Sequence, residues 1–361
     1  MANECNALNL SQGFPDFSSD AELIRLVNHY MKSGKNQYAP MQGIVELREA
    51  IARKVELLYT LTLDAEKEIN ISSGGTEAIY SAITSIIHEG DEVIVLEPAY
   101  DCYVPSIKLN GGIPIYIELE AGSLSVNWDA VKNRISQHTR MIIINTPNNP
   151  SGSVFSAFDL LQLEKITEGT DITILSDEVY EHILFDGLEH QSILRFPNLF
   201  KRSFVIFSFG KTYHNTGWKM GYCLAPEPLM KEFRRVHQFI VFSSMTPVQY
   251  ALADYLNNNN NYLKLADFYQ KKRDFFLDSI SDSKFKFKPS SGTYFQLLDY
   301  SEISDMPDME MAERLTRENG LASIPVSAFY NNKTDNKMLR FCFAKSEKTL
   351  KKAADILKKI S

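Results

Sequence analysis

Lys211 is the residue whose surroundings in the sequence most favour covalent chemistry. An apolar run from Phe204 to Phe207 ends in Ser208, and the chain after Lys211 is polar as far as Gly217. This pattern predicts a buried strand that carries the lysine to its open end. Apolar surroundings favour the neutral amine, a nucleophile that forms an imine with an aldehyde. The alternative for an isolated lysine is a side chain that extends to the surface beside the strand end.

Two residues near Lys211 suit a ligand that carries a phosphate as well as an aldehyde. Ser208 lies three residues before the lysine, and Lys219 lies eight residues after it. The whole string, S-x-x-K-T-Y-x-x-T-G-W-K-x-G, resembles the pyridoxal-phosphate lysine motif of the class I and II aminotransferases, and most of all their methionine, glutamine and kynurenine aminotransferase branch. By this resemblance, Lys211 would bind the aldehyde of pyridoxal 5'-phosphate, and Ser208 and Lys219 would bind its phosphate.

The order of strand and helix patterns predicts the fold. Between residues 69 and 225, seven strand patterns alternate with helical ones, which predicts an α/β fold with a largely parallel sheet. After the run Asn257–Asn261 the pattern changes to a long helix, a strand pair within residues 285–300 and a closing amphipathic helix. We expect a large cofactor-binding domain in residues 39–258 and a small α+β domain made of residues 1–38 and 259–361. The resemblance implies the same organisation, fold type I of the pyridoxal-phosphate enzymes.

Polar residues follow two further strand patterns, and we expect them at the same edge of the sheet as Lys211. The pattern at 172–175 precedes Asp177 and Tyr180, and the pattern at 141–144 precedes Asn149. Pyridoxal phosphate accepts electrons best with a protonated ring nitrogen, and a carboxylate about 4 Å away attracts that charge by about 4 kcal/mol at an effective dielectric near 20. The resemblance places Asp177 beside this nitrogen, and Asn149 and Tyr180 on the phenolic oxygen. The alternatives are a helix cap for Asp177 and an ordinary turn for Asn149.

A double glycine opens a predicted helix within residues 72–87. The start of a helix binds anions through its free N–H groups and its dipole. Gly75, Thr76 and Glu77 are therefore candidates to hold the phosphate, chiefly through the backbone, with the Glu77 carboxylate pointing away or favouring the dipole. Tyr100 lies in the string E-P-A-Y-D-C-Y, and the resemblance stacks its ring on the pyridine. A tight turn and a core tyrosine are the alternatives.

Arg340 lies within an apolar strand pattern, MLRFCFA, where an unpaired guanidinium is costly and requires an anion. A structural carboxylate is one candidate partner. The resemblance instead assigns Arg340 to the substrate α-carboxylate, through two hydrogen bonds that a lysine cannot copy. It also assigns Asn149, Gly13 and Phe14 to the substrate site, although the loop Q-G-F-P-D-F taken alone is an ordinary loop. Family members usually carry a longer arm before this loop, so the cover of the site and the exact specificity stay open.

The resemblance also predicts a homodimer with shared active sites. In related enzymes, the tyrosine that matches Tyr38 reaches the cofactor phosphate of the neighbouring subunit, and the phenylalanine that matches Phe242 faces the neighbour's substrate. As an isolated residue, Tyr38 would be an ordinary surface tyrosine. Phe14, Tyr38 and Phe242 predict an apolar, aromatic pocket, although Ser243 stands where the branch often has a histidine.

The composition argues against several classes of function. The chain has 361 residues, 44% of them hydrophobic, and a net charge of −7, which argues against a nucleic-acid partner. Four scattered cysteines are expected to be reduced thiols, and seven histidines without metal-ligand spacing predict no metal site. The sequence has no apolar run of membrane-spanning length and no signal-peptide layout. We therefore expect a cytoplasmic protein without a membrane partner.

Together these observations predict a pyridoxal-phosphate-dependent aminotransferase. It would move the amino group of a neutral, largely apolar or aromatic L-amino acid, such as methionine, phenylalanine, glutamine or kynurenine, to a 2-oxo acid. Lys211 would be displaced by the substrate amine and would then move a proton from Cα to the cofactor. One alternative is carbon–sulfur β-elimination from cysteine conjugates, which begins with the same carbanion. A non-catalytic ligand-binding domain is less favoured, because Lys211 and Arg340 are both present.

Overall fold

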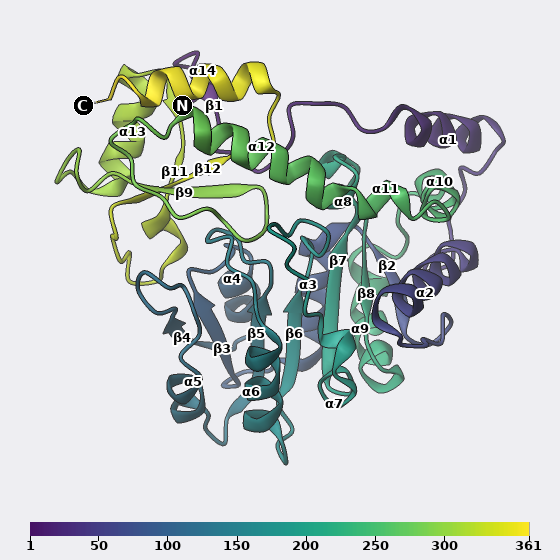
Figure 1. The fold of residues 1–361 in the computed structure, drawn as a ribbon. Helices are drawn as coiled ribbons and strands as arrows, with labels where there is room; N and C mark the ends of the chain where they lie inside the picture. The colour runs from purple at the N-terminus through teal and green to yellow at the C-terminus, as the bar shows by residue number, and fades with distance from the viewer. Residues whose placement is uncertain (361) are drawn as a thin grey trace.

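The structure, a computed structural model, describes residues 1–360 and is built around a seven-stranded sheet (Figure 1). The strand order is β2-β8-β7-β6-β5-β3-β4, and β8 runs antiparallel to both of its neighbours whereas the other pairs are parallel. This arrangement confirms the predicted α/β fold with a mostly parallel sheet. The strands are β2 (Ile69–Ser72), β3 (Glu92–Glu97), β4 (Ile113–Glu118), β5 (Thr139–Asn145), β6 (Thr173–Asp177), β7 (Ser203–Ser208) and β8 (Gly221–Leu224).

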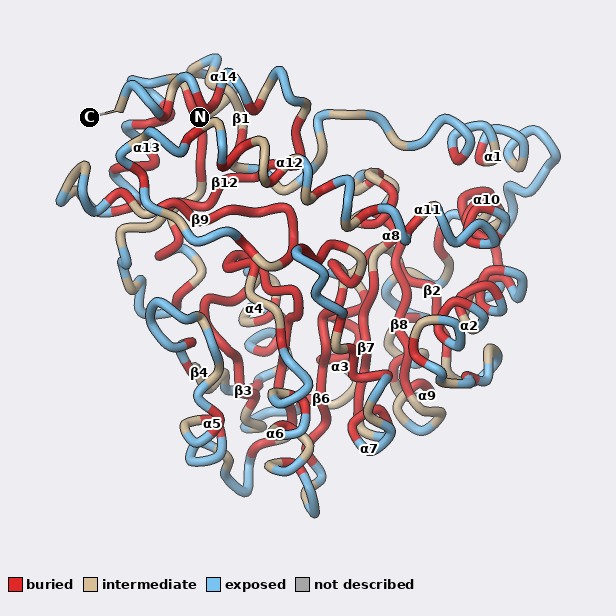
Figure 2. The backbone as a smooth tube through the Cα atoms, viewed as in Figure 1, coloured by how far each residue is buried: buried red, intermediate tan, exposed pale blue. Residues whose placement is uncertain are grey.

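Helices cover both faces of this sheet, which explains why its strands are apolar almost throughout. Along β5, Met141 and Ile143 pack with α3, α4 and α9, whereas Ile142 and Ile144 pack on the other face with α2, α5, α6 and α10. Figure 2 shows the central strands as a buried layer between partly exposed helices. The helices are α2 (Val45–Tyr59), α3 (Gly74–Ile86), α4 (Tyr103–Leu109), α5 (Trp128–Arg134), α6 (Ala157–Thr167), α9 (Glu227–Ile240) and α10 (Thr246–Leu256).

A smaller α+β part lies above the sheet in Figure 1. Its antiparallel sheet has the order β11-β12-β9, and β1 pairs in parallel with β10 beside it. The segment predicted to form a strand pair does pair with itself, but only through one antiparallel bridge between Lys286 and Asp299. Along its length its strand β9 pairs with β12, which lies much later in the chain. The elements are β1 (Leu8–Asn9), β9 (Phe295–Asp299), β10 (Leu321–Ala322), β11 (Ile324–Pro325), β12 (Met338–Cys342), α12 (Leu265–Ser279), α13 (Asp308–Glu318) and α14 (Glu347–Leu357).

The N-terminal segment contributes to both parts of the molecule. Leu10 belongs to the core of the smaller part, together with residues of β9, β12 and α14. In contrast, Leu23 and Val27 of α1 (Ala21–Lys32) join the core that covers the large sheet, where α1 packs against α10 (Figure 1). The division into residues 39–258 and the two flanking segments stays a prediction.

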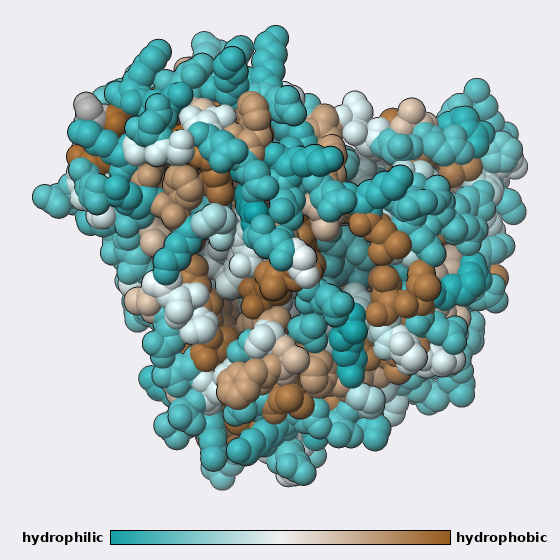
Figure 3. All heavy atoms as spheres, viewed as in Figure 1, coloured by the Kyte–Doolittle hydropathy of each residue, from teal (hydrophilic) through white to brown (hydrophobic). Residues whose placement is uncertain are grey.

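The surface is mostly hydrophilic, with hydrophobic patches on the face shown in Figure 3. Within residues 1–360, no helix combines the length and hydrophobicity that crossing a membrane requires. In the same range, no group of three or more His, Cys, Asp or Glu side chains is placed to hold a metal ion.

The carboxyl ends of β5, β6 and β7 bring the predicted site residues to one edge. Asn145 pairs with Asp177, and Asp177 pairs with Ile206 on β7. Strand β7 continues to Ser208 and into α8 (Phe209–Thr212), which carries Lys211. The remaining short elements are α7 (Pro197–Phe200), α11 (Asn260–Leu263) and the 3-10 turns η1 (Ile193–Arg195), η2 (Thr216–Trp218) and η3 (Val326–Phe329).

The close approach of β8 to the start of α3 requires a glycine at position 221, and this can be tested. A Cβ atom at Gly221 would lie 2.7 Å from the Phe207 carbonyl oxygen and 2.9 Å from the Gly74 carbonyl carbon. We expect Gly221→Ala to lower the free energy of unfolding by about 1–3 kcal/mol, as overpacking does elsewhere. Urea denaturation of the variant and the wild type measures this change in the free energy of unfolding. The control is Gly217→Ala, where a Cβ would meet nothing within 4 Å; equal stability of the two variants would contradict the argument.

Candidate active site

A cavity of about 110 Å³ lies at the carboxyl edge of the sheet. It gathers most of the residues that the sequence predicted for cofactor chemistry, together with several that it did not. Its walls come from the start of α3, from the ends of β5, β6 and β7, and from the segment that follows Lys211. The lining residues are Gly74, Gly75, Thr76, Ile79, Tyr100, Asn145, Asn149, Asp177, Val179, Tyr180, Ser208, Gly210, Lys211, Thr216, Lys219 and Met220.

The amine of Lys211 is held at the cavity by two oxygen atoms. Its Nζ donates to the Tyr294 hydroxyl at 2.9 Å and, more weakly, to the Gly13 carbonyl at 3.4 Å. Burial lowers the pKa of Lys211 to about 8, although the nearby Asp177 carboxylate acts in the opposite direction. A substantial neutral fraction near pH 7 makes this amine both a nucleophile and a base.

Asp177 is the last residue of β6, and its side chain is buried against the cavity. Its Oδ2 accepts a hydrogen bond from the Tyr103 hydroxyl at 2.6 Å, and its Oδ1 accepts one from the Val179 amide at 3.3 Å. Burial raises the pKa of Asp177 to about 6, while the Tyr103 hydroxyl lowers it. The group is therefore mostly ionised at neutral pH. No helix begins after it in the structure, so its role is not that of a helix cap.

Arg340 is buried on β12 and points its guanidinium toward the same region. Its Nη1 donates to Asn149 Oδ1 at 2.7 Å and its Nη2 donates to the Ser11 carbonyl at 2.9 Å, while Nε has no partner in the described chain. Both acceptors are neutral oxygens, so within residues 1–360 no carboxylate pairs with this guanidinium, which removes the alternative of a structural acidic partner. Burial lowers the pKa of Arg340. A buried cation without an anion leaves a place for an anionic ligand.

The start of α3 offers a second place for an anion. The first N–H groups of a helix lack intrahelical partners, and Ser73 provides no side-chain cap here. A Cβ at Gly74, whose φ is +82°, would lie 3.3 Å from Lys219 Nζ, so this ammonium group lies next to the helix start. The Glu77 carboxylate turns back to the Ser73 amide, Ser81 and His237, and it stays out of the cavity lining.

These donors fit the parts of a phosphorylated pyridine aldehyde. Ser208, Lys219 and the free N–H groups of α3 form a phosphate-sized cluster of donors, and Tyr100 adds a flat ring to the same wall. Asp177 supplies a buried carboxylate for a ring nitrogen. Asn149 uses its oxygen on Arg340, which leaves its amide hydrogens free to donate.

The aminotransferase class I and II family model matches residues 6–357. The chain belongs to this family. Class I and II aminotransferases depend on pyridoxal phosphate, so the donors described above match the cofactor of the family. The protein is therefore an aminotransferase, as the lysine motif predicted.

Relatives of this aminotransferase share its whole length. It is 46% identical over 361 residues to the methionine aminotransferase of Escherichia coli strain K12, covering 100% of this chain and 94% of that one. It is 35% identical over 404 residues to the kynurenine–oxoglutarate transaminase of Dictyostelium discoideum, covering 100% of this chain and 92% of that one.

Solved structures agree with these relationships. The E. coli protein YbdL, identified as a methionine aminotransferase, superposes with a TM-score of 0.97 at 46% identity, covering 99% of this chain and 95% of that chain. The N-succinyldiaminopimelate aminotransferase of Mycobacterium tuberculosis superposes with a TM-score of 0.96 at 31% identity. This match covers 100% of this chain and 95% of that chain. The fold type I architecture of the aminotransferase is thus confirmed.

Some residues expected at the active site of this aminotransferase do not line the cavity. Arg340 and Gly13 contact residues that do, namely Asn149 and Lys211. Phe14 is 41% exposed, and Tyr38 and Phe242 are 84% and 42% exposed. The rings of the last two pack edge to face at 5.5 Å on the surface.

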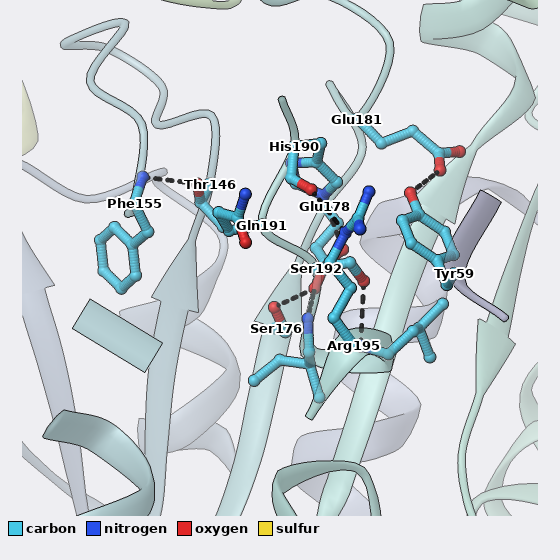
Figure 4. A network of polar contacts seen from close by, with 12 residues as sticks. Tyr59, Thr146, Phe155, Ser176, Glu178, Glu181, His190, Gln191, Ser192 and Arg195 are labelled. Carbon is cyan, nitrogen blue, oxygen red and sulfur yellow. Dashed lines mark hydrogen bonds and ion pairs between the residues drawn. The ribbon is translucent and has the colours of Figure 1, made fainter. Parts of the chain in front are cut away.

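The segment that carries Asp177 and Tyr180 is anchored from behind by a buried polar network (Figure 4). Glu178 follows Asp177 directly in the chain. Its carboxylate accepts hydrogen bonds from the Ser176 hydroxyl at 2.8 Å and the Ile193 amide at 3.1 Å. The same carboxylate contacts His190 Nε2 at 2.8 Å. Because neighbouring residues point to opposite sides, every bond made by Glu178 fixes the backbone that aims Asp177 at the cavity.

Glu181 provides the second anchor of the same segment. It accepts a hydrogen bond from the Tyr59 hydroxyl at 2.9 Å (Figure 4). It also forms a buried ion pair with Lys54. Burial opposes its charge, but His182 and Lys54 hold the pKa of Glu181 below its ordinary value. Lys54 also donates to the Tyr222 hydroxyl at 2.9 Å. The aminotransferase thus ties its α2 helix to the back of the active-site segment.

Sequence reasoning missed Tyr103 and Tyr294, which contact the two central ionisable groups. Tyr103 stands three residues after Tyr100 in the string Y-D-C-Y, and that spacing places it on the first turn of α4. This signal could have identified it as a partner for a cavity residue. Tyr294 precedes an ordinary apolar strand, and no local pattern marks it.

Breaking the Lys54–Glu181 pair should destabilise the protein. We expect Lys54→Met to lower the free energy of unfolding by about 3–5 kcal/mol, because Glu181 would remain as a buried charge without its cation. Urea denaturation at neutral pH measures the change. The matched control is Arg235→Met, which breaks an exposed pair with Glu232 and should change stability little. A Lys54→Met variant as stable as this control would contradict the assignment.

Proposed function

We propose that this aminotransferase transfers the amino group of a neutral, largely apolar or aromatic L-amino acid, of the methionine, phenylalanine, glutamine or kynurenine type, to a 2-oxo acid. The observation that carries the proposal is the pairing of a lysine amine of lowered pKa with a buried arginine that lacks an acidic partner. The amine of Lys211 provides a base and nucleophile, and the guanidinium of Arg340 provides a site for a carboxylate.

We infer that pyridoxal phosphate binds in the cavity, where it would supply an electron sink for the substrate carbanion. Its phosphate would be held by Ser208, by Lys219 and by the backbone of Gly75, Thr76 and Glu77. Its ring would lie against Tyr100, with the Asp177 carboxylate at the ring nitrogen. Asn149 and Tyr180 would donate to the phenolic oxygen, for which the free amide hydrogens of Asn149 are suited.

Arg340 would orient the substrate through its α-carboxylate. Its Nε has no partner and its Nη atoms donate only to neutral oxygens, so a carboxylate would gain a charge-assisted pair of hydrogen bonds. The planar guanidinium packs 4.0 Å from the Phe295 ring centroid, which fixes its orientation. This contact favours one direction of approach for the amino acid.

Lys211 would then carry the proton. Its neutral amine accepts the proton from the substrate Cα, so that a C–H bond breaks, an N–H bond forms and the electron pair stays on the substrate side. The same amine returns the proton in the second step. A pKa near 8 leaves about one tenth of the amine neutral at pH 7, which can accept the proton, while the protonated form can return it.

The preference for an uncharged side chain is supported by the lining of the cavity. Among the described residues that line it, the cations are Lys211 and Lys219, and both have roles already assigned. A distal carboxylate would therefore lack a partner. The aromatic residues Phe14, Tyr38 and Phe242 and the names of the relatives at 46% and 35% identity support an apolar or aromatic substrate.

A homodimer with shared active sites is the proposed assembly. Tyr38, Phe239, Phe242 and Met245 are 84%, 86%, 42% and 47% exposed, a concentration of apolar surface that favours an interface. In such a dimer Tyr38 and Phe242 would complete the neighbour's site. The four unpaired cysteines support a cytoplasmic location.

The proposed function is tested by a panel of amino acids in the half-reaction. The purified protein loaded with pyridoxal phosphate is mixed with each amino acid, and the spectrum of the cofactor reports conversion of its aldehyde form to its amine form. Methionine, phenylalanine, glutamine or kynurenine should convert it fastest. Aspartate and glutamate should be slow. Release of ammonia and a thiol from a cysteine conjugate without any 2-oxo acid would instead favour β-elimination.

Removing the lysine amine should abolish turnover. We expect Lys211→Ala to lower kcat by at least about 10⁴-fold, because both the covalent attachment and the proton carrier are lost. Steady-state assay with methionine and a 2-oxo acid measures this. Lys201→Ala, at the opposite end of β7, is the control and should retain full activity; an active Lys211→Ala variant would refute the assignment.

The role of Arg340 predicts a selective effect on substrate binding. We expect Arg340→Lys to raise KM for the amino acid by about 10 to 100-fold, since one ammonium cannot reproduce two parallel hydrogen bonds to a carboxylate. Cofactor affinity, measured by titration of the visible absorbance, should change much less. A variant with unchanged KM would show that the carboxylate binds elsewhere.

A further inference from the structure

Tyr294 is the residue nearest to the Lys211 amine, and nothing assigned so far gives it a role. It precedes β9 and is completely buried. Its ring packs edge to face against Tyr180 at 5.2 Å and against Phe295 at 5.0 Å. Its carbonyl accepts from the Phe343 amide at 2.9 Å, so backbone and ring are both fixed.

The hydrogen bonds of the Tyr294 hydroxyl have a defined direction. The hydroxyl has a single hydrogen, which it donates to the Gly13 carbonyl at 2.7 Å. Its oxygen must therefore accept in the 2.9 Å contact with Lys211 Nζ. Burial raises the pKa of Tyr294 well above its ordinary value, so it stays a neutral phenol.

The Gly13 carbonyl is the second acceptor for the same amine, at 3.4 Å from Nζ. Only glycine allows this loop to lie so close, because a Cβ at Gly13 would be 2.5 Å from Phe295 Cζ. The N-terminal loop and the residue before β9 thus present two oxygens to one nitrogen.

We propose that Tyr294 and the Gly13 carbonyl hold the free amine of Lys211 by its two hydrogens, so that its lone pair is directed at the substrate Cα during proton transfer. A neutral primary amine has two N–H groups and one lone pair, and two acceptors occupy the hydrogens. The Cα–H bond breaks as the third N–H bond forms, and the charge that develops on nitrogen is stabilised by both oxygens. This inference rests on the proposed function and makes Tyr294 a positioning residue for Lys211.

Hydrogen exchange of the lysine amine tests the hydrogen bond directly. In cofactor-free protein labelled with ¹⁵N-lysine, we expect the Lys211 amine hydrogens in Tyr294→Phe to exchange with water about tenfold faster than in the wild type, the effect of losing one hydrogen bond to a charged group. The matched control is Tyr269→Phe. Tyr269 is equally buried, its ring lies 5.7 Å from that of Tyr294, and its hydroxyl has no partner within residues 1–360.

The half-reaction of the loaded enzyme gives the second readout. With methionine, the half-reaction of Tyr294→Phe should be about tenfold slower than that of Tyr269→Phe. The kinetic isotope effect from α-deuterated methionine should rise, whereas KM for methionine should be nearly unchanged. A general loss of packing would alter KM and stability without raising the isotope effect. Exchange rate and isotope effect both within twofold of the control would overturn the inference.

Two outcomes separate this inference from the function on which it rests. If the wild-type enzyme converts no amino acid of the panel, the proposed function fails, whereas the exchange experiment still reports on Tyr294. If the wild type is active and Tyr294→Phe behaves like Tyr269→Phe, only the inference fails. Should Tyr294→Phe not fold, 3-fluorotyrosine at position 294, a weaker acceptor of similar size, should give a smaller change in the same direction, and no change would overturn the inference.

Discussion

The constraint on which the active site depends is the removal of its charged groups from water. Burial lowers the pKa of Lys211 to about 8, raises that of Asp177 to about 6 and leaves Arg340 without an acidic partner. Each of these groups is costly in the protein alone. Each becomes favourable when a ligand supplies the complementary charge. In the proposed function, this charge comes from the α-carboxylate of a neutral amino acid and from the protonated ring nitrogen of the cofactor.

The polar network behind the cavity shows how the fold tolerates this cost. Asp177 and Tyr180 line the cavity. Glu178 and Glu181 of the same segment contact His190 and Tyr59 (Figure 4), and Glu181 also pairs with Lys54. On the cavity side, Asp177 accepts hydrogen bonds from the Tyr103 hydroxyl and the Val179 amide. The bonds of Glu178 and Glu181 hold the same segment from the other side, so its backbone is fixed on both faces.

The sequence predicted what local patterns control. Apolar runs identified all seven strands of the large sheet, because most positions of strands buried on both faces are apolar. The ends of those strands then located Lys211, Asp177 and Asn149. Pairings between distant segments were not predictable in this way. Strand β9 pairs along its length with β12, whereas the neighbouring segment adds only the bridge between Lys286 and Asp299. Tyr294 likewise meets Lys211 across 83 positions of sequence. Such contacts depend on how the two parts pack, which no local periodicity encodes.

This long-range origin determines what the smaller part contributes to catalysis. The oxygens that hold the Lys211 amine come from the N-terminal loop and from the residue before β9, while the lysine itself comes from the large sheet. The guanidinium of Arg340 likewise comes from β12 and reaches Asn149 at the end of β5. In the proposed mechanism, substrate orientation and the direction of the lysine lone pair therefore depend on the same contact between the two parts. Any displacement of one part against the other changes both together, so the packing of the smaller part on the sheet edge is itself a component of the active site.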